Sequence, residues 1–498
     1  MLFVGNADSD EVCLQISNGT NAKYAALSHR WGRREVTACT TTANLGDRTR
    51  NIPSSDLSQL FLDAVTVTRR LGLLYLWIDS LCILQDSRDD WERESALMGD
   101  VFGNSEITIS AVSAEDGSSG FLGPRDTHMV CIKYKKSALL PSEGVMYVRR
   151  PKNRLAKVVR ECALNNRAWV IQERILAPRI LTFAESQVFW ECREMVAGEG
   201  GSQYTNMAHI NRRLIRILQE LSLDRTNASL KAGVYAAWRQ VVQEASEAGL
   251  TYESDRLHTI AGLSRLLQQE LRTEYVCGTW MEDLALGISW APQPRNGTLF
   301  TCRLPSVPRA PSWCWSSLEG PINFGRDDLK SCTVCFERIT NSLPTIVIDT
   351  ETNQPSRGLE ASWALHVRAH VARCEVTING VFWRGSENPQ AVRPESEDYN
   401  MTAKGGGLAT LNEAGVLIGG SRFDLQPTQS SLGHYSCLLL LDCILDLDAS
   451  RYGVGLLLRT NMRPYDTQHT YTRVGRVTLG TAGVEWLRQV ELESVCLI

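Results

Sequence analysis

The sequence lacks the features that would place the protein in a membrane or on nucleic acid. Its 52 Lys and Arg residues are outnumbered by 56 Asp and Glu residues, and it has no long basic run that could neutralise a string of phosphates. The N-terminus has no basic start followed by an apolar stretch, so no secretory signal is predicted. The most continuous apolar run, residues 437–447, falls well short of the roughly 20 residues that span a bilayer. We expect a cytoplasmic protein with no membrane span and no nucleic-acid partner.

Several short motifs of well-known chemistry are missing as well. The chain has no G-x-x-x-x-G-K-[ST] loop, no G-x-G-x-x-G fingerprint, and no H-E-x-x-H or G-x-S-x-G element, which argues against ATP hydrolysis, Rossmann redox chemistry, zinc proteolysis and α/β-hydrolase chemistry. Its 15 cysteines are an odd number, scattered singly, so reduced thiols are expected. The one close pair, Cys332 and Cys335, has no second ligand pair at zinc spacing. We predict no metal site and no bound cofactor.

The hydrophobic pattern predicts an α/β domain over residues 1–195. Apolar strand-like runs at residues 24–28, 73–78 and 107–111 alternate with two helical patterns, one that starts near Pro53 and one that starts near residue 89. This β-α-β-α-β order favours a parallel, flavodoxin-like sheet. A helix-like segment at 168–176 and a strand-like segment at 187–192 complete the domain.

Two further regions follow. Residues 196–300 are dominated by helical periodicity, for example at 210–223 and 257–271. Residues 301–498 alternate as strands do, at 363–371, 452–459 and 471–479, with an Asn379-Gly380 hairpin turn between strands 375–378 and 381–383. We therefore expect a helical region and then an antiparallel, β-rich C-terminal region.

Ordered blocks of sequence carry a resemblance to a known family. They are residues 26–32 (ALSHRWG), 76–85 (LWIDSLCILQ), Trp91 with Glu94 and Met98, Arg167-Ala168-Trp169 with Gln172, Glu173 and Arg179, and 190–192 (WEC). In order and spacing these blocks resemble the fungal heterokaryon incompatibility (HET) domain. Residues 255–257, 261–262, 278–280 and 310–315 resemble the region that commonly follows this domain.

The resemblance implies a protein of filamentous fungi that acts in self/non-self recognition or programmed cell death, with protein partners or self-association through the HET domain. HET domains are considered distant relatives of Toll/interleukin-receptor (TIR) domains, some of which cleave NAD with one glutamate. Two alternatives therefore stay open: a TIR-like enzyme that cleaves a nucleotide such as NAD, and an enzyme or accessory protein of a fungal secondary-metabolite cluster. Whether the chain is an enzyme is not decided by the sequence.

Glu94 is the first candidate for chemistry. With Trp91, Met98 and Phe102 it falls on one face of a helix. A carboxylate on a buried face must be paired, protonated or placed at a cleft. The structural alternative is an ion pair with an arginine such as Arg167 or Arg179. The catalytic alternative rests on the TIR analogy, although Glu94 follows Trp91 by three residues, whereas four are expected in the TIR pattern.

Other candidates follow two of the predicted strands, at the edge where parallel sheets bind ligands. Together with Glu94, we predict the catalytic residues to be Asp79, Cys82 and His29. The residues predicted to bind a nucleotide or small metabolite are Ser80 and Arg30 at the same strand ends, and Arg167 beside the helix-like segment at 168–176. Asp79 and Ser80 can instead cap a turn. Cys82 can instead be inert packing, and Arg167 can hold nearby carboxylates.

Overall fold

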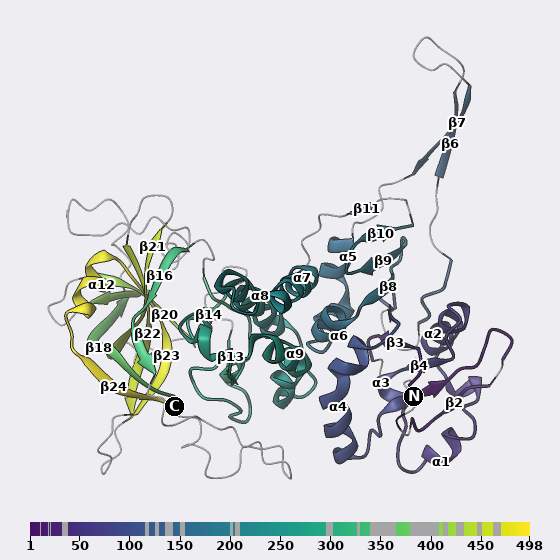
Figure 1. Ribbon diagram of the computed structural model, residues 1–498, viewed down its shortest axis with the longest axis horizontal. Coiled ribbons are helices and arrows are strands. Elements are labelled where there is room, and N and C mark those ends of the chain that lie inside the picture. Colours follow the sequence, from purple (N-terminus) through teal and green to yellow (C-terminus); the bar gives the residue numbers. More distant parts are fainter. Residues whose placement is uncertain are drawn as a thin grey trace. The chain divides into compact units, whose positions relative to one another are not determined.

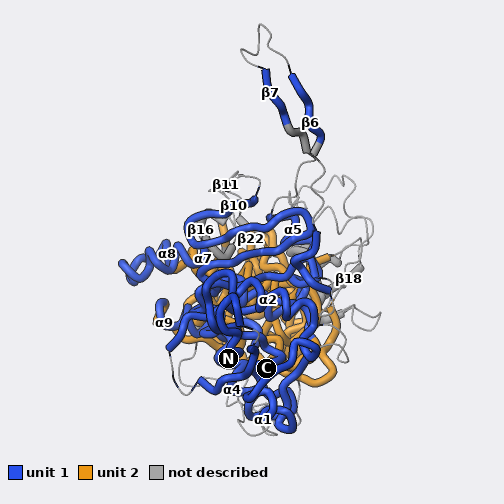
Figure 2. The backbone as a smooth tube through the Cα atoms, turned by 90° about the vertical axis from the view of Figure 1, so that its right-hand side faces the viewer, with its two compact units in different colours: residues 1–230, 248–250, 258–270 blue, residues 231–247, 251–257, 271–498 orange. Residues whose placement is uncertain are grey.

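The computed structural model describes two compact units. The described residues are 1–9, 11–17, 19, 21–31, 38–114, 119–124, 129–134, 143–149, 155–199, 203–204, 210–294, 302–325, 329–338, 365–378, 408–411, 417–424, 433–445, 451–461 and 470–498. Unit 1 comprises residues 1–230, 248–250 and 258–270, and unit 2 comprises residues 231–247, 251–257 and 271–498 (Figure 2).

Unit 1 is built on a nine-stranded mixed sheet with the order β11-β10-β9-β8-β5-β3-β4-β1-β2 (Figure 1). Its strands are β1 (Leu2–Phe3), β2 (Cys13–Leu14), β3 (Tyr24–Ser28), β4 (Tyr75–Trp77), β5 (Ile107–Ser110), β8 (Arg179–Phe183), β9 (Val188–Cys192), β10 (Val196–Gly198) and β11 (Gln203–Tyr204).

The predicted parallel sheet is confirmed for the four central strands only. β3 pairs in parallel with β4 and β5, and β5 pairs in parallel with β8. The outer pairs β1–β2, β1–β4, β8–β9, β9–β10 and β10–β11 are antiparallel. Connection length explains the antiparallel pairs β8–β9, β9–β10 and β10–β11, because these strands are joined by short turns, whereas parallel neighbours need a long crossover.

Helices cover both faces of the parallel core, as the alternation of side chains along β3 and β4 requires. Leu27 and Leu76 share a core cluster with Phe61 of α2 (Gln59–Arg70). Their neighbours Ala26 and Trp77 pack on the opposite face in a cluster with residues of α4 (Arg88–Gly103). In Figure 1, α2 lies on one side of these strands and α4 on the other.

Capping side chains set where these two helices begin. Ser58 accepts a hydrogen bond from the Phe61 amide, so α2 begins at Gln59. The expected start near Pro53 is instead a separate turn, η1 (Ser54–Asp56). Ser87 caps α4 through the Asp90 amide, close to the predicted start near residue 89.

The structure describes further helices in both units, and several of them lie in the predicted helical region. They are α1 (Leu45–Arg48), α3 (Asp79–Cys82), α5 (Leu155–Glu161), α6 (Val170–Leu176), α7 (Ile210–Leu223), α8 (Ala228–Glu247), α9 (Ala261–Leu271), α10 (Leu284–Gly287), α12 (Thr481–Arg488), and the 3-10 turns η2 (Ala163–Asn166), η3 (Glu253–Arg256), η4 (His258–Ile260), η5 (Met281–Asp283) and η6 (Trp315–Ser317).

A glycine contact brings α4 and α9 together within unit 1. A Cβ atom on Gly99 would meet the Cα atom of Gly262 at 2.7 Å, so no side chain fits at either position without a shift. The Gly262 amide also donates a hydrogen bond to the side-chain oxygen of Gln172 on α6 (3.2 Å). The segment after residue 257 is therefore part of the packing around α4 and α6.

Unit 2 contains a second nine-stranded sheet, which follows the order β16-β21-β22-β23-β20-β19-β18-β17, with β24 paired to β18 and β23. Its strands are β16 (Leu329–Val334), β17 (Phe336–Arg338), β18 (Leu365–Ile378), β19 (Leu408–Leu411), β20 (Leu417–Phe423), β21 (Gly433–Leu445), β22 (Arg451–Asn461), β23 (Thr470–Leu479) and β24 (Leu492–Leu497). Small two-stranded sheets are β6 (Met129–Tyr134) with β7 (Gly144–Arg149) in unit 1, and β12 (Tyr275–Val276) with β13 (Thr279–Trp280) and β14 (Ala291–Pro292) with β15 (Ile322–Asn323) in unit 2.

The predicted β-rich C-terminal region is confirmed, and all its pairings except β23–β24 are antiparallel. The Asn379-Gly380 turn lies outside the described residues. The expectation of reduced thiols is wrong for Cys443, which forms a disulfide bond. The residue opposite it in register is Cys332, and strand pairing thus brings near Cys443 a cysteine that is distant in sequence.

Within the described residues, no helix has both the length and the apolar character needed to cross a bilayer. The same residues contain no group of three or more His, Cys, Asp or Glu side chains placed to hold a metal ion.

Candidate functional site

His29 stands directly after β3, and the strand's alternation directs its ring toward α2. The ring lies edge-on to Phe61 at 5.3 Å between centroids, and the residue is only 2% exposed. Its Nδ1 atom is 3.8 Å from Asp79 Oδ1. Burial lowers the pKa of His29, a trend that the Asp79 carboxylate opposes and the positive charge of Arg167 reinforces. The imidazole is therefore neutral at neutral pH.

Asp79 is the first residue after the β4 strand and its flanking Ile78, and it begins the single turn α3. Its Oδ1 atom accepts a hydrogen bond from the Ser80 amide (2.8 Å), and its Oδ2 atom accepts one from the Trp31 indole (2.6 Å). The carboxylate thus ties the end of β3 to the end of β4. The hydroxyl of Ser80 itself is buried and has no hydrogen-bond partner.

The turn that carries Asp79 is held from two sides. The Gln85 side-chain amide donates to the carbonyl oxygens of Asp79 (3.1 Å) and Ile83 (3.0 Å). On the other side, the Thr40 hydroxyl donates to the Leu81 carbonyl (2.7 Å), and the Thr40 amide donates to the Ser80 carbonyl (3.0 Å). These contacts explain why the sequence block at 76–85 pairs an apolar strand with polar residues, since its polar members satisfy the backbone of the turn.

Two charged residues lie near the same strand ends. Arg167 follows the turn η2, and Glu173 lies on α6. The Arg167 guanidinium donates to the backbone carbonyl of His29. Glu173 is 4% exposed, and burial raises the pKa of its carboxyl from 4.5 to about 7, with a further upward contribution from the Asp79 charge. Arg167 and the Ser28 hydroxyl oppose this rise.

These four side chains form one electrostatic group, which we call the strand-end cluster: His29, Asp79, Arg167 and Glu173. His29 and Glu173 each interact electrostatically with Asp79 and Arg167, and burial shifts the pKa values of these two side chains in opposite directions. Two atoms of the cluster, His29 Nε2 and Glu173 Oε2, are buried without a hydrogen-bond partner. The cluster therefore has unused hydrogen-bonding capacity.

Comparison with known protein families matches the part of the chain that contains this cluster. Residues 24–173 match the family model described as heterokaryon incompatibility protein (HET). The chain carries a HET domain. The match begins at the first residue of β3 and ends at Glu173, so it contains every member of the strand-end cluster. Comparison with curated proteins and with solved structures gave no match.

The structure places Glu94 of the HET domain apart from the interactions of the cluster. Its side chain is 24% exposed, and its Oε1 atom is 3.5 Å from Arg93 Nε. Burial and the Asp90 charge raise the pKa of Glu94, while Arg93 and the N-terminal ammonium lower it. The arginine it contacts is thus its own helix neighbour rather than Arg167 or Arg179, the latter being paired with Glu106 (3.2 Å).

Cys82 and Arg30 also differ from the cluster in their surroundings. Cys82 is half-buried and packs on the apolar clusters of both faces of the sheet. The His29 ring lies against Phe61, and its Nδ1 atom is 3.8 Å from Asp79 Oδ1. Arg30 is exposed. Of the predicted site residues, the HET domain therefore brings together His29, Asp79 and Arg167, with Ser80 adjacent.

Glu173 was not among the residues predicted from sequence to be catalytic. A signal was present, because Gln172, Glu173 and Arg174 interrupt an otherwise apolar helix. All seven residues of α6 are buried in the structure. Charged residues inside a wholly buried helix are rare unless they are paired or functional, and this feature identifies Glu173 more directly than the amphipathic pattern identifies Glu94.

Proposed function

We propose that this heterokaryon incompatibility-type protein is a self/non-self recognition or cell-death effector, which signals through its HET domain by binding protein partners or a second copy of itself. The family match over residues 24–173 supports the general role. The observation that carries the finer proposal is the burial of the strand-end cluster, since His29 and Glu173 are 2% and 4% exposed. Groups so enclosed set the conformation of a domain rather than meet a substrate from solvent.

The cluster supports a signalling role because it joins three segments of the domain. Arg167 contacts the backbone of β3's end, Asp79 contacts Trp31, and Glu173 lies on α6. A change at any one segment alters the electrostatic environment of the other two. We infer that partner binding is transmitted between the strand ends and α6 through these charges.

The sheet order is consistent with a flavodoxin/TIR-like fold, which we propose for the HET domain. The parallel strands follow the order β4-β3-β5-β8, which corresponds to the first four positions of the 2-1-3-4-5 order of flavodoxin-like sheets. Helices on both faces agree with a doubly wound arrangement. The antiparallel edge strands are additions to that core.

Induced expression in a filamentous fungus tests the effector role. We expect wild-type protein to kill cells, measured as uptake of a vital dye and loss of colony formation. Glu94→Gln is expected to kill equally, because that carboxylate makes no contact with the strand-end cluster among the described residues. Leu27→Asp places a charge in the core of the sheet, where Leu27 is 1% exposed, and is expected to abolish killing. Survival of cells that accumulate wild-type protein would overturn the proposal.

The nucleotide-cleaving alternative is separated by a biochemical assay. Purified full-length protein, as a monomer and as any oligomer it forms, is incubated with NAD and released nicotinamide is measured. The effector proposal expects no release. Release that Glu94→Gln abolishes would replace it with the TIR-like enzyme. The biosynthetic-cluster alternative stays a prediction, and an unchanged metabolite profile after gene deletion would count against it.

A further inference from the structure

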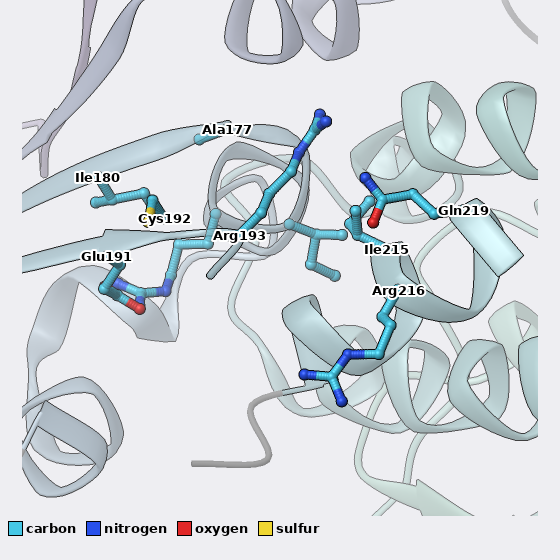
Figure 3. A pocket seen from close by; sticks show the side chains of 10 residues that line it. Ala177, Ile180, Glu191, Cys192, Arg193, Ile215, Arg216 and Gln219 are labelled. Carbon is cyan, nitrogen blue, oxygen red and sulfur yellow. The ribbon is translucent and has the colours of Figure 1, made fainter. Parts of the chain in front are cut away.

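A second polar site lies in unit 1, in a pocket between the sheet and α7. It is formed by residues of α6, of β8 and β9, and of α7 (Figure 3). Ile175, Ala177, Ile180 and Ile215 give it an apolar wall. The polar lining residues are Arg174, Glu191, Cys192, Arg193, Arg216 and Gln219. Three of the lining residues are arginines, and one is a carboxylate.

The single carboxylate is already engaged. Arg174 Nη2 contacts both Glu191 oxygens, at 2.7 and 2.9 Å, and the Thr182 hydroxyl donates to Glu191 Oε1 at 3.3 Å. Arg174 is 8% exposed, and its Nη1 atom is buried without a hydrogen-bond partner. A buried guanidinium nitrogen without an acceptor costs free energy, so Glu191 does not satisfy every donor of Arg174.

The two remaining arginines provide net positive charge. Arg193 and Arg216 are exposed, and neither forms an ion pair with any residue that the structure describes. Figure 3 shows the Arg193 and Arg216 side chains extending in opposite directions, so their guanidinium groups do not yet converge. Both are long side chains at the surface, which turn readily toward an anion.

We propose that this pocket binds a phosphate group, either as free phosphate or as the phosphomonoester of a small metabolite. Its volume of about 70 Å³ is far below that of pockets that enclose whole drug-sized ligands, so one oxyanion enters and any remaining part of the ligand stays outside. Arg193 and Arg216 turn toward the ligand and bind its oxygens by charge-assisted hydrogen bonds, and the buried Arg174 adds a third positive charge to the lining. Binding would join α7 to the β8–β9 edge.

Titration of the purified full chain with inorganic phosphate and with glycerol 3-phosphate tests this site, by calorimetry at constant ionic strength. We expect saturable binding of at least one probe at one site per chain. The double variant Arg193→Gln/Arg216→Gln should weaken it roughly tenfold or more, because charge-assisted hydrogen bonds are lost. Arg213→Gln is the matched control, since Arg213 is exposed on the same helix but does not line the pocket.

Each outcome of the titration either identifies the kind of phosphate that binds or contradicts the proposed site. Tighter binding of inorganic phosphate assigns the site to the free ion, and tighter binding of glycerol 3-phosphate assigns it to a phosphomonoester. Absence of saturable binding for both probes would overturn the proposal. Equal weakening by Arg213→Gln and by the double variant would do so as well, because it would indicate a general charge effect. The assay does not depend on cell killing, so it is independent of the proposed function.

Discussion

Replacement of Glu173 by Gln tests the electrostatic description of the strand-end cluster. The carboxyl of Glu173 loses its proton near its ordinary pKa of 4.5 in the unfolded chain and at about 7 in the folded protein. Between these two values the native state holds a proton that the unfolded state has released. Stability therefore falls as pH rises through this window, because the unfolded state binds fewer protons.

The size of this effect follows from the pKa difference. One pKa unit corresponds to about 1.4 kcal/mol, so a rise from 4.5 to about 7 lowers the free energy of unfolding by about 3 kcal/mol at alkaline pH relative to acid pH. Glutamine has nearly the same shape and does not ionise. The variant should gain about 2 to 3 kcal/mol over wild type between about pH 5 and about pH 8.

Scanning calorimetry of both proteins across this pH range provides the measurement, since the two units can unfold in separate transitions. The quantity of interest is the difference between variant and wild type at each pH, in which any constant effect of the substitution cancels. Glu185→Gln is the control for removal of a carboxylate charge, because Glu185 is exposed in the same unit. A flat difference for Glu173→Gln would refute the assignment of a raised pKa to this buried carboxyl.

Two further substitutions test packing and charge burial. Gly262→Ala should destabilise unit 1 by about 1 to 3 kcal/mol in thermal unfolding, because its new methyl group would meet Gly99. Gly46→Ala, with no atom within 4 Å of the added group, should have no such effect, and equal losses would contradict the packing argument. In unit 2, Asp424→Ala should cost about 3 to 5 kcal/mol in urea denaturation, because it leaves fully buried Arg473 without its carboxylate partner (3.0 Å). A loss below about 1 kcal/mol would show that the carbonyls of Ile288 and Trp290, which Arg473 also contacts, suffice to hold that charge.

Sequence reasoning succeeded where the evidence was local. The apolar runs and helical periodicity predicted β3, β4, β5, α2 and α4 close to their observed bounds, because burial on both faces leaves a near-continuous apolar signature in each strand. The strand-like segment predicted at 187–192 corresponds to β9. Its antiparallel pairing was not predicted, since the direction of pairing depends on connections and neighbours rather than on composition. The later start of α2 came from one capping serine, Ser58.

The candidate site shows the same division. Adjacency to strand ends led to the prediction of His29 and Asp79, because the ends of parallel strands share one edge, and both interact electrostatically with Arg167 in the structure. Glu94 was selected for its place on an amphipathic face, yet its ion pair is with Arg93 of the same helix. The raised pKa of Glu173 could not be predicted from sequence, since a pKa of about 7 depends on burial between segments that are distant in the chain.

The sequence by itself therefore determined the HET resemblance, the alternating strands and helices β3-α2-β4-α4-β5 of the N-terminal domain, and the β-rich character of the C-terminal region. Local chain properties encode all three. Only the tertiary structure decided which charges meet, because Arg167 reaches the carbonyl of His29 across 138 residues and Arg174 meets Glu191 from a different element. Such pairings depend on how segments pack in three dimensions, and no spacing within one segment records them.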